Sequence, residues 1–300
     1  ISVTELSIDL KRSSTEPLKL PESLALPFSL SVEKIAIDSL SVKKLGMGPM
    51  LKNVHSALIA KDGQWHLNEL GFDSAFGTVV MNASLQVEKP FALSGRIQVD
   101  NTDVDAHLVM DAKGTLDQMQ LSGVLSGYGA TGELKAEITP FESFIFNTLD
   151  LTASNINPSK FDETWPVAQF DIDTHIQTHS THKVEGKLNI VNALPGAIEK
   201  NRLPIHRVQA TIGGTVDSVN LSSLMIDLGQ AGQFLGNAQF SEMKTAVDLK
   251  TKNFNLHGIS ETLRPTHAQG TVSYHCIENK QEIVTDLKEN HIQLKADILK

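Results

Sequence analysis

Residues 79–99 read VVMNASLQVEKPFALSGRIQV, and this stretch decides the fold. Every second side chain from Val79 to Val87, and again from Phe91 to Val99, is apolar or a glycine, with mostly polar residues between them. A period of two places alternate side chains on opposite faces of a strand. Glu88-Lys89-Pro90 separates the two runs with residues that favour a turn. The stretch therefore predicts two antiparallel strands that share one apolar face.

The same alternation continues toward both ends of the chain. Further runs with a period of two lie at 104–110, 132–138, 149–153, 170–176, 184–190, 208–212, 224–228 and 292–298. Their spacing is typical of an antiparallel meander, and it predicts about 18 to 20 strands. Only residues 157–163 and 256–263 predict short helical interruptions. With so little helix to cover it, the sheet must bury its apolar face by curving or by pairing with a second sheet.

Small residues are frequent at the inward positions of these runs, and aromatic residues make up only 5% of the chain. A dense sandwich core draws on bulky side chains in facing layers. The alternative is that the small residues let two sheets approach closely. We favour an all-β fold in which a long, meandering, mostly antiparallel sheet curls into an elongated U-shaped groove (a β-taco) with an apolar interior. We expect residues 1–300 to form one continuous segment of such a groove, cut from a longer protein.

The inward positions are the predicted lining of the groove, and they carry no charge. They are Val79, Met81, Ala83, Leu85, Val87, Phe91, Leu93, Ile97, Val99, Val104, Ala106, Leu108, Leu134, Ala136, Ile138, Leu149, Leu151, Phe170, Ile172, Val184, Leu188, Ile190, Val208 and Ile212.

The composition argues against several classes of protein. A net charge of −9 without a basic cluster disfavours a nucleic-acid partner. The single cysteine, Cys276, cannot form a disulfide within the chain or belong to a cysteine-rich metal site. No segment approaches the roughly 18 to 20 apolar residues that cross a bilayer, and the first residues lack the pattern of a secretory signal.

Candidate catalytic and metal-binding residues are few. His175, His179 and His182 lie close together in the sequence, near Asp171 and Asp173, but a zinc site needs three or four converging ligands. His275 and Cys276 are neighbours, and on a strand adjacent side chains point to opposite faces. The glycine pairs lack the strand, loop and helix context of a phosphate cradle. We therefore predict no enzymatic activity, no cofactor and no metal.

Several short segments resemble the TamB family of periplasmic proteins. They occur in the expected order over much of the chain: Leu26-Pro27-Phe28 before 32–37, Asp62-Gly63-Gln64-Trp65, Thr139-Pro140-Phe141, 186–196 with Asn201-Arg202-Leu203-Pro204, and Leu263-Arg264-Pro265-Thr266 before Gly270.

The resemblance implies a β-groove in the periplasm of a Gram-negative bacterium, in a protein anchored to the inner membrane by a segment outside this sequence. It also implies a role in outer-membrane biogenesis. The expected partners are phospholipids and, through regions outside this chain, an outer-membrane protein of the Omp85 type (TamA-like).

Two functions of different classes follow. The first is a lipid conduit, in which apolar inward side chains shield acyl chains while head groups stay at the open seam. The second is a scaffold that assembles outer-membrane β-barrel proteins by pairing with client strands at exposed sheet edges. Both predict the same fold.

Overall fold

The computed structural model describes residues 2–10, 20–44, 50–75, 77–103, 105–141, 146–179, 183–215, 217–241, 244–277, 280–289 and 292–299. The chain divides into two compact units, residues 1–147 (unit 1) and residues 148–300 (unit 2), and each is described by itself. Unit 1 contains β1 (Ser2–Leu10), β2 (Leu30–Lys44), β3 (Met50–Lys61), β4 (Gln64–Ser74), β5 (Gly77–Gln86), β6 (Ala92–Asn101), β7 (Ala106–Thr115), β8 (Met119–Gly127) and β9 (Ala130–Ile138).

Unit 2 contains the remaining strands and four short 3₁₀ turns. The strands are β10 (Phe146–Ile156), β11 (Phe170–Thr178), β12 (Val184–Asn192), β13 (Arg207–Thr215), β14 (Ser218–Asp227), β15 (Gln233–Ser241), β16 (Lys244–Phe254), β17 (Ala268–Ile277), β18 (Lys280–Glu289) and β19 (Ile292–Leu299). The turns are η1 (Pro158–Lys160), η2 (Ile198–Lys200), η3 (Gly229–Ala231) and η4 (Leu256–Gly258). Among the described residues, no helix is long and apolar enough to cross a membrane.

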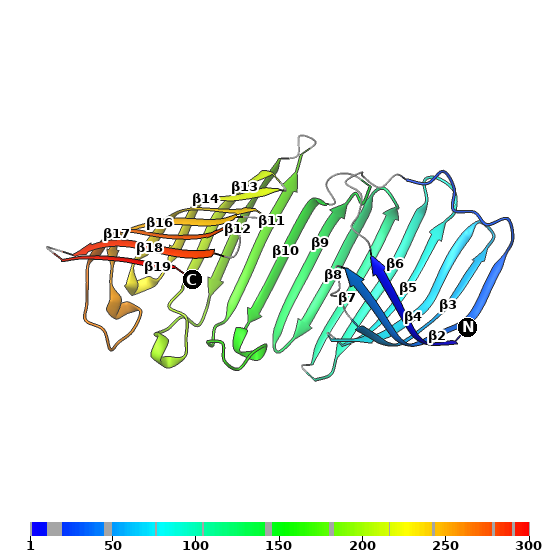
Figure 1. Cartoon of the computed structure of the whole chain (residues 1–300), viewed down its shortest axis with the longest axis horizontal. Coiled ribbons are helices and arrows are strands. Elements are labelled where there is room, and N and C mark those ends of the chain that lie inside the picture. The colour runs from blue at the N-terminus through cyan, green and yellow to red at the C-terminus, as the bar shows by residue number, and fades with distance from the viewer. Residues whose placement is uncertain are drawn as a thin grey trace. The chain divides into compact units, whose positions relative to one another are not determined.

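The all-β prediction is confirmed, and the strands follow one another as a meander (Figure 1). In unit 1, β1 pairs with β2 in parallel, and each strand from β2 to β9 pairs antiparallel with the next. In unit 2, every strand from β10 to β19 pairs antiparallel with the next. The described strands of each unit form an open, curved sheet that does not close into a barrel. One continuous groove over residues 1–300 stays a prediction.

Cross-strand register aligns the apolar side chains of unit 1 in rows. Across β5 to β9 the rows are Leu85–Leu93–Gly114–Met119–Ile138, Ala83–Gly95–Ala112–Leu121–Ala136, Met81–Ile97–Met110–Gly123–Leu134 and Val79–Val99–Leu108–Leu125–Gly132. The opposite face of the same strands carries polar and charged residues such as Asn82, Arg96, Asp111, Ser122 and Lys135. We call the face with the apolar rows the inner face of unit 1.

Unit 2 has an inner face of the same kind. Three rows cross β11 to β17: Ile172–Ile190–Val208–Ile226–Phe234–Thr251–Gly270, Thr174–Leu188–Ala210–Leu224–Gly236–Leu249–Val272, and Ile176–Gly186–Ile212–Leu221–Ala238–Val247–Tyr274. The rows pass a register shift between β13 and β14, and another between β14 and β15. All members of these rows are uncharged. Burial raises the pKa of Tyr274, as expected for a phenol beside apolar neighbours.

At Gly236, on the inner face of unit 2, the backbones of neighbouring strands approach each other closely. A Cβ atom there would lie 1.8 Å from the carbonyl oxygen of Asp248 on β16. At Gly123, on the inner face of unit 1, the nearest atom to such a Cβ would be the Val109 oxygen at an ordinary 3.5 Å. The two inward glycines therefore differ: a side chain at position 236 would collide with the backbone of β16, whereas position 123 has room for one.

We predict that Gly236→Ala destabilises the protein by about 1–3 kcal/mol, because the added methyl must displace backbone. Gly123→Ala is the matched control and should change the free energy of unfolding by less than about 0.5 kcal/mol. Chemical denaturation of both variants measures the difference. Equal stabilities would show that the strands beside Gly236 can separate without cost.

His107 lies on the outer face of unit 1, the face opposite the apolar rows. Hydrogen bonds from its ring to Asp100 (2.7 Å) and Asp105 raise the pKa of His107 above its usual value of 6.5. A raised pKa means that the folded state binds the proton more tightly than the unfolded state, so this interaction stabilises the fold below about pH 6.5. The contribution is lost as the pH rises through the raised pKa.

We expect NMR titration to give His107 a pKa above 6.5, and Asp100→Asn to return the value toward 6.5. The melting temperatures of the two proteins should differ most at acidic pH and converge as the pH increases. A difference that grows with pH would contradict this assignment.

Candidate functional site

The inner faces are covered far less than the core of a globular protein. The chain exposes 19329 Å² of surface, whereas a globular monomer of 32.7 kDa is expected to expose ~12,400 Å². Most inner-face side chains are only partly buried. A sandwich of two sheets would bury both inner faces. The small inward residues therefore do not serve the close packing of two sheets within either unit.

Some inner-face side chains are exposed outright. Leu125 on β8 is 49% exposed, and Phe240 on β15 is 41% exposed. Their counterparts on the outer face, Val124 (56%) and Leu235 (52%), are exposed to a similar degree. The exposures are similar, but the cross-strand partners differ. Leu125 and Phe240 pair with uncharged residues, whereas Val124 and Leu235 each pair with one apolar residue and one charged residue, Glu133 and Lys250.

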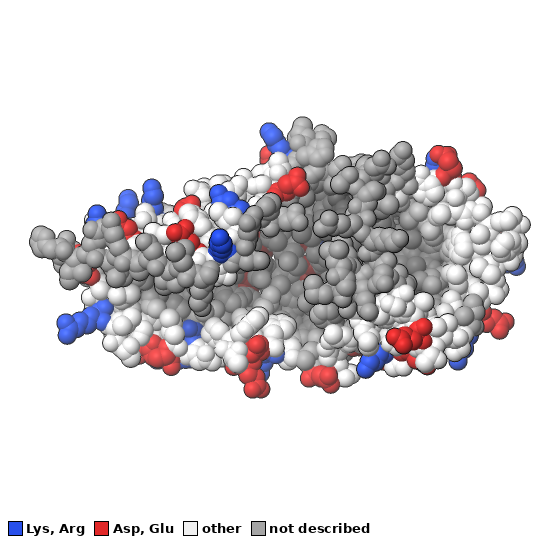
Figure 2. Space-filling view, viewed as in Figure 1, with Lys and Arg blue, Asp and Glu red and all other residues white. Residues whose placement is uncertain are grey.

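The apolar rows of both units contain no charged side chain. In Figure 2, the Lys, Arg, Asp and Glu side chains that are coloured lie mostly toward the margins of the view. An uncharged, partly open apolar face can hold a flexible apolar ligand, because no charge in these rows opposes its entry. Thr251 Oγ1, in one row of unit 2, is buried without a hydrogen-bond partner.

Most of the predicted lining residues lie on strands and face inward. The register places Met81 opposite Ile97, Leu108 opposite Leu125, and Ile190 opposite Val208. Val104 lies outside the described residues. Leu121, Leu125, Phe240 and Ile283 are also inward but were not predicted. The alternation Met119, Leu121, Gly123, Leu125 could have revealed the first two.

Phe91 and Val87 differ from the prediction in position. Both belong to the turn between β5 and β6, where Phe91 has a positive φ of 55° and is 0% exposed. Val87 accepts a hydrogen bond from Leu24 N at 2.8 Å, and Trp65 Nε1 donates to Leu24 O at 3.0 Å. The alternation placed Val87 and Phe91 in strands, but the turn around Pro90 includes both, because β5 ends at Gln86 and β6 begins at Ala92. Phe91 fills one end of the sheet and has no exposed surface for a bound lipid.

The histidines considered as metal ligands pair with carboxylates instead. His175 contacts Asp150 on the neighbouring strand, and His179 lies 3.4 Å from Glu185. His182 lies outside the described residues. No group of three potential ligands occurs among the residues that the structure describes. On the outer face, His275 lies near Asp248 and Glu282. Cys276 lies on the inner face of β17, as Tyr274 does, so the two neighbours point to opposite faces.

Unit 2 has long connections at one edge of its sheet only. Residues 157–169, 193–206, 228–232 and 255–267 form what we call the long-loop edge, and each of the four 3₁₀ turns lies in one of them (Figure 1). Connections between the other strand ends are short, as in residues 216–217 and 242–243. Because the connections differ in length, we expect the two edges of the unit 2 sheet to have different roles.

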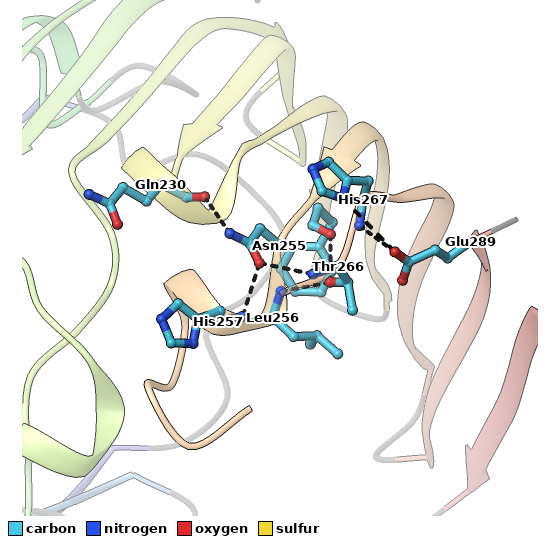
Figure 3. Close-up of polar contacts among 8 residues, drawn as sticks. Gln230, Asn255, Leu256, His257, Thr266, His267 and Glu289 are labelled. Carbon is cyan, nitrogen blue, oxygen red and sulfur yellow. Dashed lines mark hydrogen bonds and ion pairs between the residues drawn. The ribbon is translucent and has the colours of Figure 1, made fainter. Parts of the chain in front are cut away.

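An asparagine organises the last of these loops (Figure 3). The Oδ1 atom of Asn255 accepts hydrogen bonds from His257 N and Thr266 N, both at 3.1 Å, and its Nδ2 atom donates to Gln230 O at 3.4 Å. Beside it, the loops leave a cavity of about 440 Å³ whose lining includes His206, Leu228, His257 and Glu261. The cavity shows that polar groups gather where the apolar rows end.

No family model matches the chain, and no significant similarity to a curated protein or to a solved structure was found. The function is therefore inferred from the geometry of the inner faces and their edges.

Proposed function

We propose that the inner faces bind the acyl chains of phospholipids and that the protein is a non-enzymatic lipid conduit of the TamB kind. The observation that carries the proposal is the set of aligned apolar rows, which are uncharged and remain partly open to solvent. Under this proposal the protein functions in the periplasm, between the inner and outer membranes, and contributes to outer-membrane biogenesis.

The energetics of an acyl chain fit such a face. Each buried CH₂ group contributes ~0.8 kcal/mol, so a partly covered chain is held by several kcal/mol. Rows of similar side chains give similar affinity at each step across the strands, so a lipid can move without leaving a deep minimum. The polar groups at the long-loop edge, including His206 and His257 around the cavity, offer hydrogen-bond partners to a head group that stays at the border.

A crosslinking experiment tests whether lipid lies on the inner face. A photo-crosslinking amino acid at Leu125 or Phe240 should capture phospholipid from cells or from vesicles. The same group at Val124 or Leu235 should not, although these residues are equally exposed. Mass spectrometry of the crosslinked protein gives the readout. The reason is geometric: a shift by one residue moves the side chain to the other face of the sheet.

Equal lipid capture from both faces would indicate mere proximity to a membrane and would overturn the proposal. Capture of protein alone at inner positions, with outer-membrane β-barrel proteins among the products, would favour the strand-assembly scaffold instead.

Charge on the inner face should block binding without unfolding the chain. Leu125→Arg places a guanidinium beside the apolar rows at an already exposed position, and desolvating it under an acyl chain is costly. Phospholipid that co-purifies with the protein should fall severalfold in native mass spectrometry. Val124→Arg carries the same charge on the outer face and should retain wild-type lipid content. Loss of lipid in both variants would point to an effect of net charge alone.

A further inference from the structure

Two loops at the long-loop edge are copies of one structure. Residues 155–168 (first copy) and 253–266 (second copy) both begin Asn-apolar-Asn, and both contain Glu-Thr followed by a large apolar residue. The identical positions are Asn155 and Asn253, Asn157 and Asn255, Glu163 and Glu261, and Thr164 and Thr262. The strands before them also share a register shift, between Ala153 and Ile156 and between Thr251 and Phe254.

Several hydrogen bonds recur at the same positions of the two copies. Asn157 Oδ1 accepts from Ser159 N and Ala168 N, as Asn255 Oδ1 accepts from His257 N and Thr266 N. Two further pairs of bonds are related in the same way. Phe161 N donates to Pro158 O, as Ile259 N donates to Leu256 O. Trp165 N donates to Asp162 O, as Leu263 N donates to Ser260 O. These bonds fix the same conformation in each loop, and some backbone groups of the second copy, such as Ile259 O and Glu261 N, bond with another segment.

In the second copy, one edge is occupied by the loop between β12 and β13. Ile198 N donates to Ile259 O at 3.1 Å, the Glu199 carboxylate accepts from Glu261 N, and Lys200 Nζ donates to the Glu261 carboxylate. The η2 turn thus presents an apolar residue, an acid and a base in succession to the edge. Hydrogen bonds from the backbone N–H groups of Glu199 itself and of Glu261 lower the pKa of Glu199, so the acid is charged in this contact.

At the corresponding edge of the first copy, around Glu163, no contact from the β12–β13 loop is found among the described residues. Glu163, the counterpart of Glu261, is exposed, and no hydrogen bond or ion pair to it is found among the described residues. Trp165, the counterpart of Leu263, is 51% exposed. The β12–β13 loop touches the first copy elsewhere: Val167 N donates to Asn201 O at 2.8 Å. Directly after the copy, Gln169 O accepts from Ala193 N at 2.8 Å.

We propose that the edge of the first copy at Glu163 is a docking site for a polypeptide turn with the chemistry of residues 197–200, small–apolar–acidic–basic, supplied by a partner protein. The second copy is the template: it shows which backbone N–H and which carboxylate receive the turn. The partner's base pairs with the Glu163 carboxylate, and its acid accepts from Glu163 N. This inference does not depend on lipid binding.

A peptide with the sequence of the chain's own loop is the probe. In the protein, Gly196 N donates to Leu203 O at 3.0 Å, which closes this loop. A cyclised peptide with the sequence of residues 195–204, PGAIEKNRLP, should therefore be preorganised for binding. Titrated into the full chain, it should cause a saturable change in the fluorescence of Trp165, with a Kd on the order of 1 mM or below. Trp165→Phe should remove the signal. The second copy should not compete, because its own loop is held at a high effective concentration.

Charge reversal identifies the contact. Glu163→Lys should weaken binding about fivefold, and a peptide with glutamate in place of the lysine at position 200 should weaken binding to the natural chain similarly. Combining the two changes should restore affinity. Glu133→Lys, an exposed reversal on the outer face of β9, controls for net charge and should bind like the natural chain. Absence of a saturable change up to about 5 mM peptide, equal weakening by Glu163→Lys and Glu133→Lys, or failure of the double reversal to restore binding would each overturn the proposal.

Discussion

Cross-strand apolar rows hold each unit together, because every inward side chain is flanked by another one at the same height on the neighbouring strand. Such pairs contribute about 0.2–1 kcal/mol each relative to alanine. In a sandwich, a second sheet would add its own burial. Here the rows gain apolar burial from contact between side chains on neighbouring strands of the same curved sheet. The cluster of Ala210, Leu224 and Ala238 in unit 2 is an example. The rest of the structure follows from this constraint.

Small residues interrupt the rows at several points, as at Gly95, Gly123 and Gly236. A concave face brings neighbouring backbones together, and Gly236 occupies a point where no Cβ fits. Where the face is more open, large side chains such as Leu125 and Phe240 remain exposed. An apolar surface left open in this way is costly in water unless something covers it. A mobile apolar ligand that contributes its own burial is the simplest means of covering it.

The two borders of the unit 2 sheet divide the remaining tasks. Only two to five residues separate consecutive strands at one border. The long-loop edge, at the other border, has exposed apolar residues, hydrogen-bonded asparagines and a cavity. Two loops at this edge share one conformation, fixed by hydrogen bonds at corresponding positions. The second of them binds a neighbouring loop through Ile259 O and Glu261 N.

The sequence by itself determined the all-β class, the antiparallel order of the strands and the uncharged inner face. These are properties of local alternation and turn chemistry, which act over a few residues. It also indicated short helical turns near residues 157 and 256, but not those at Ile198–Lys200 and Gly229–Ala231. The tertiary structure alone decided that Phe91 plugs an end of the sheet, that bulges keep Leu224 beside Ala210, and that Lys200 meets Glu261. Each of these depends on which strands and loops lie side by side, and contacts between residues distant in sequence are not encoded in any local period.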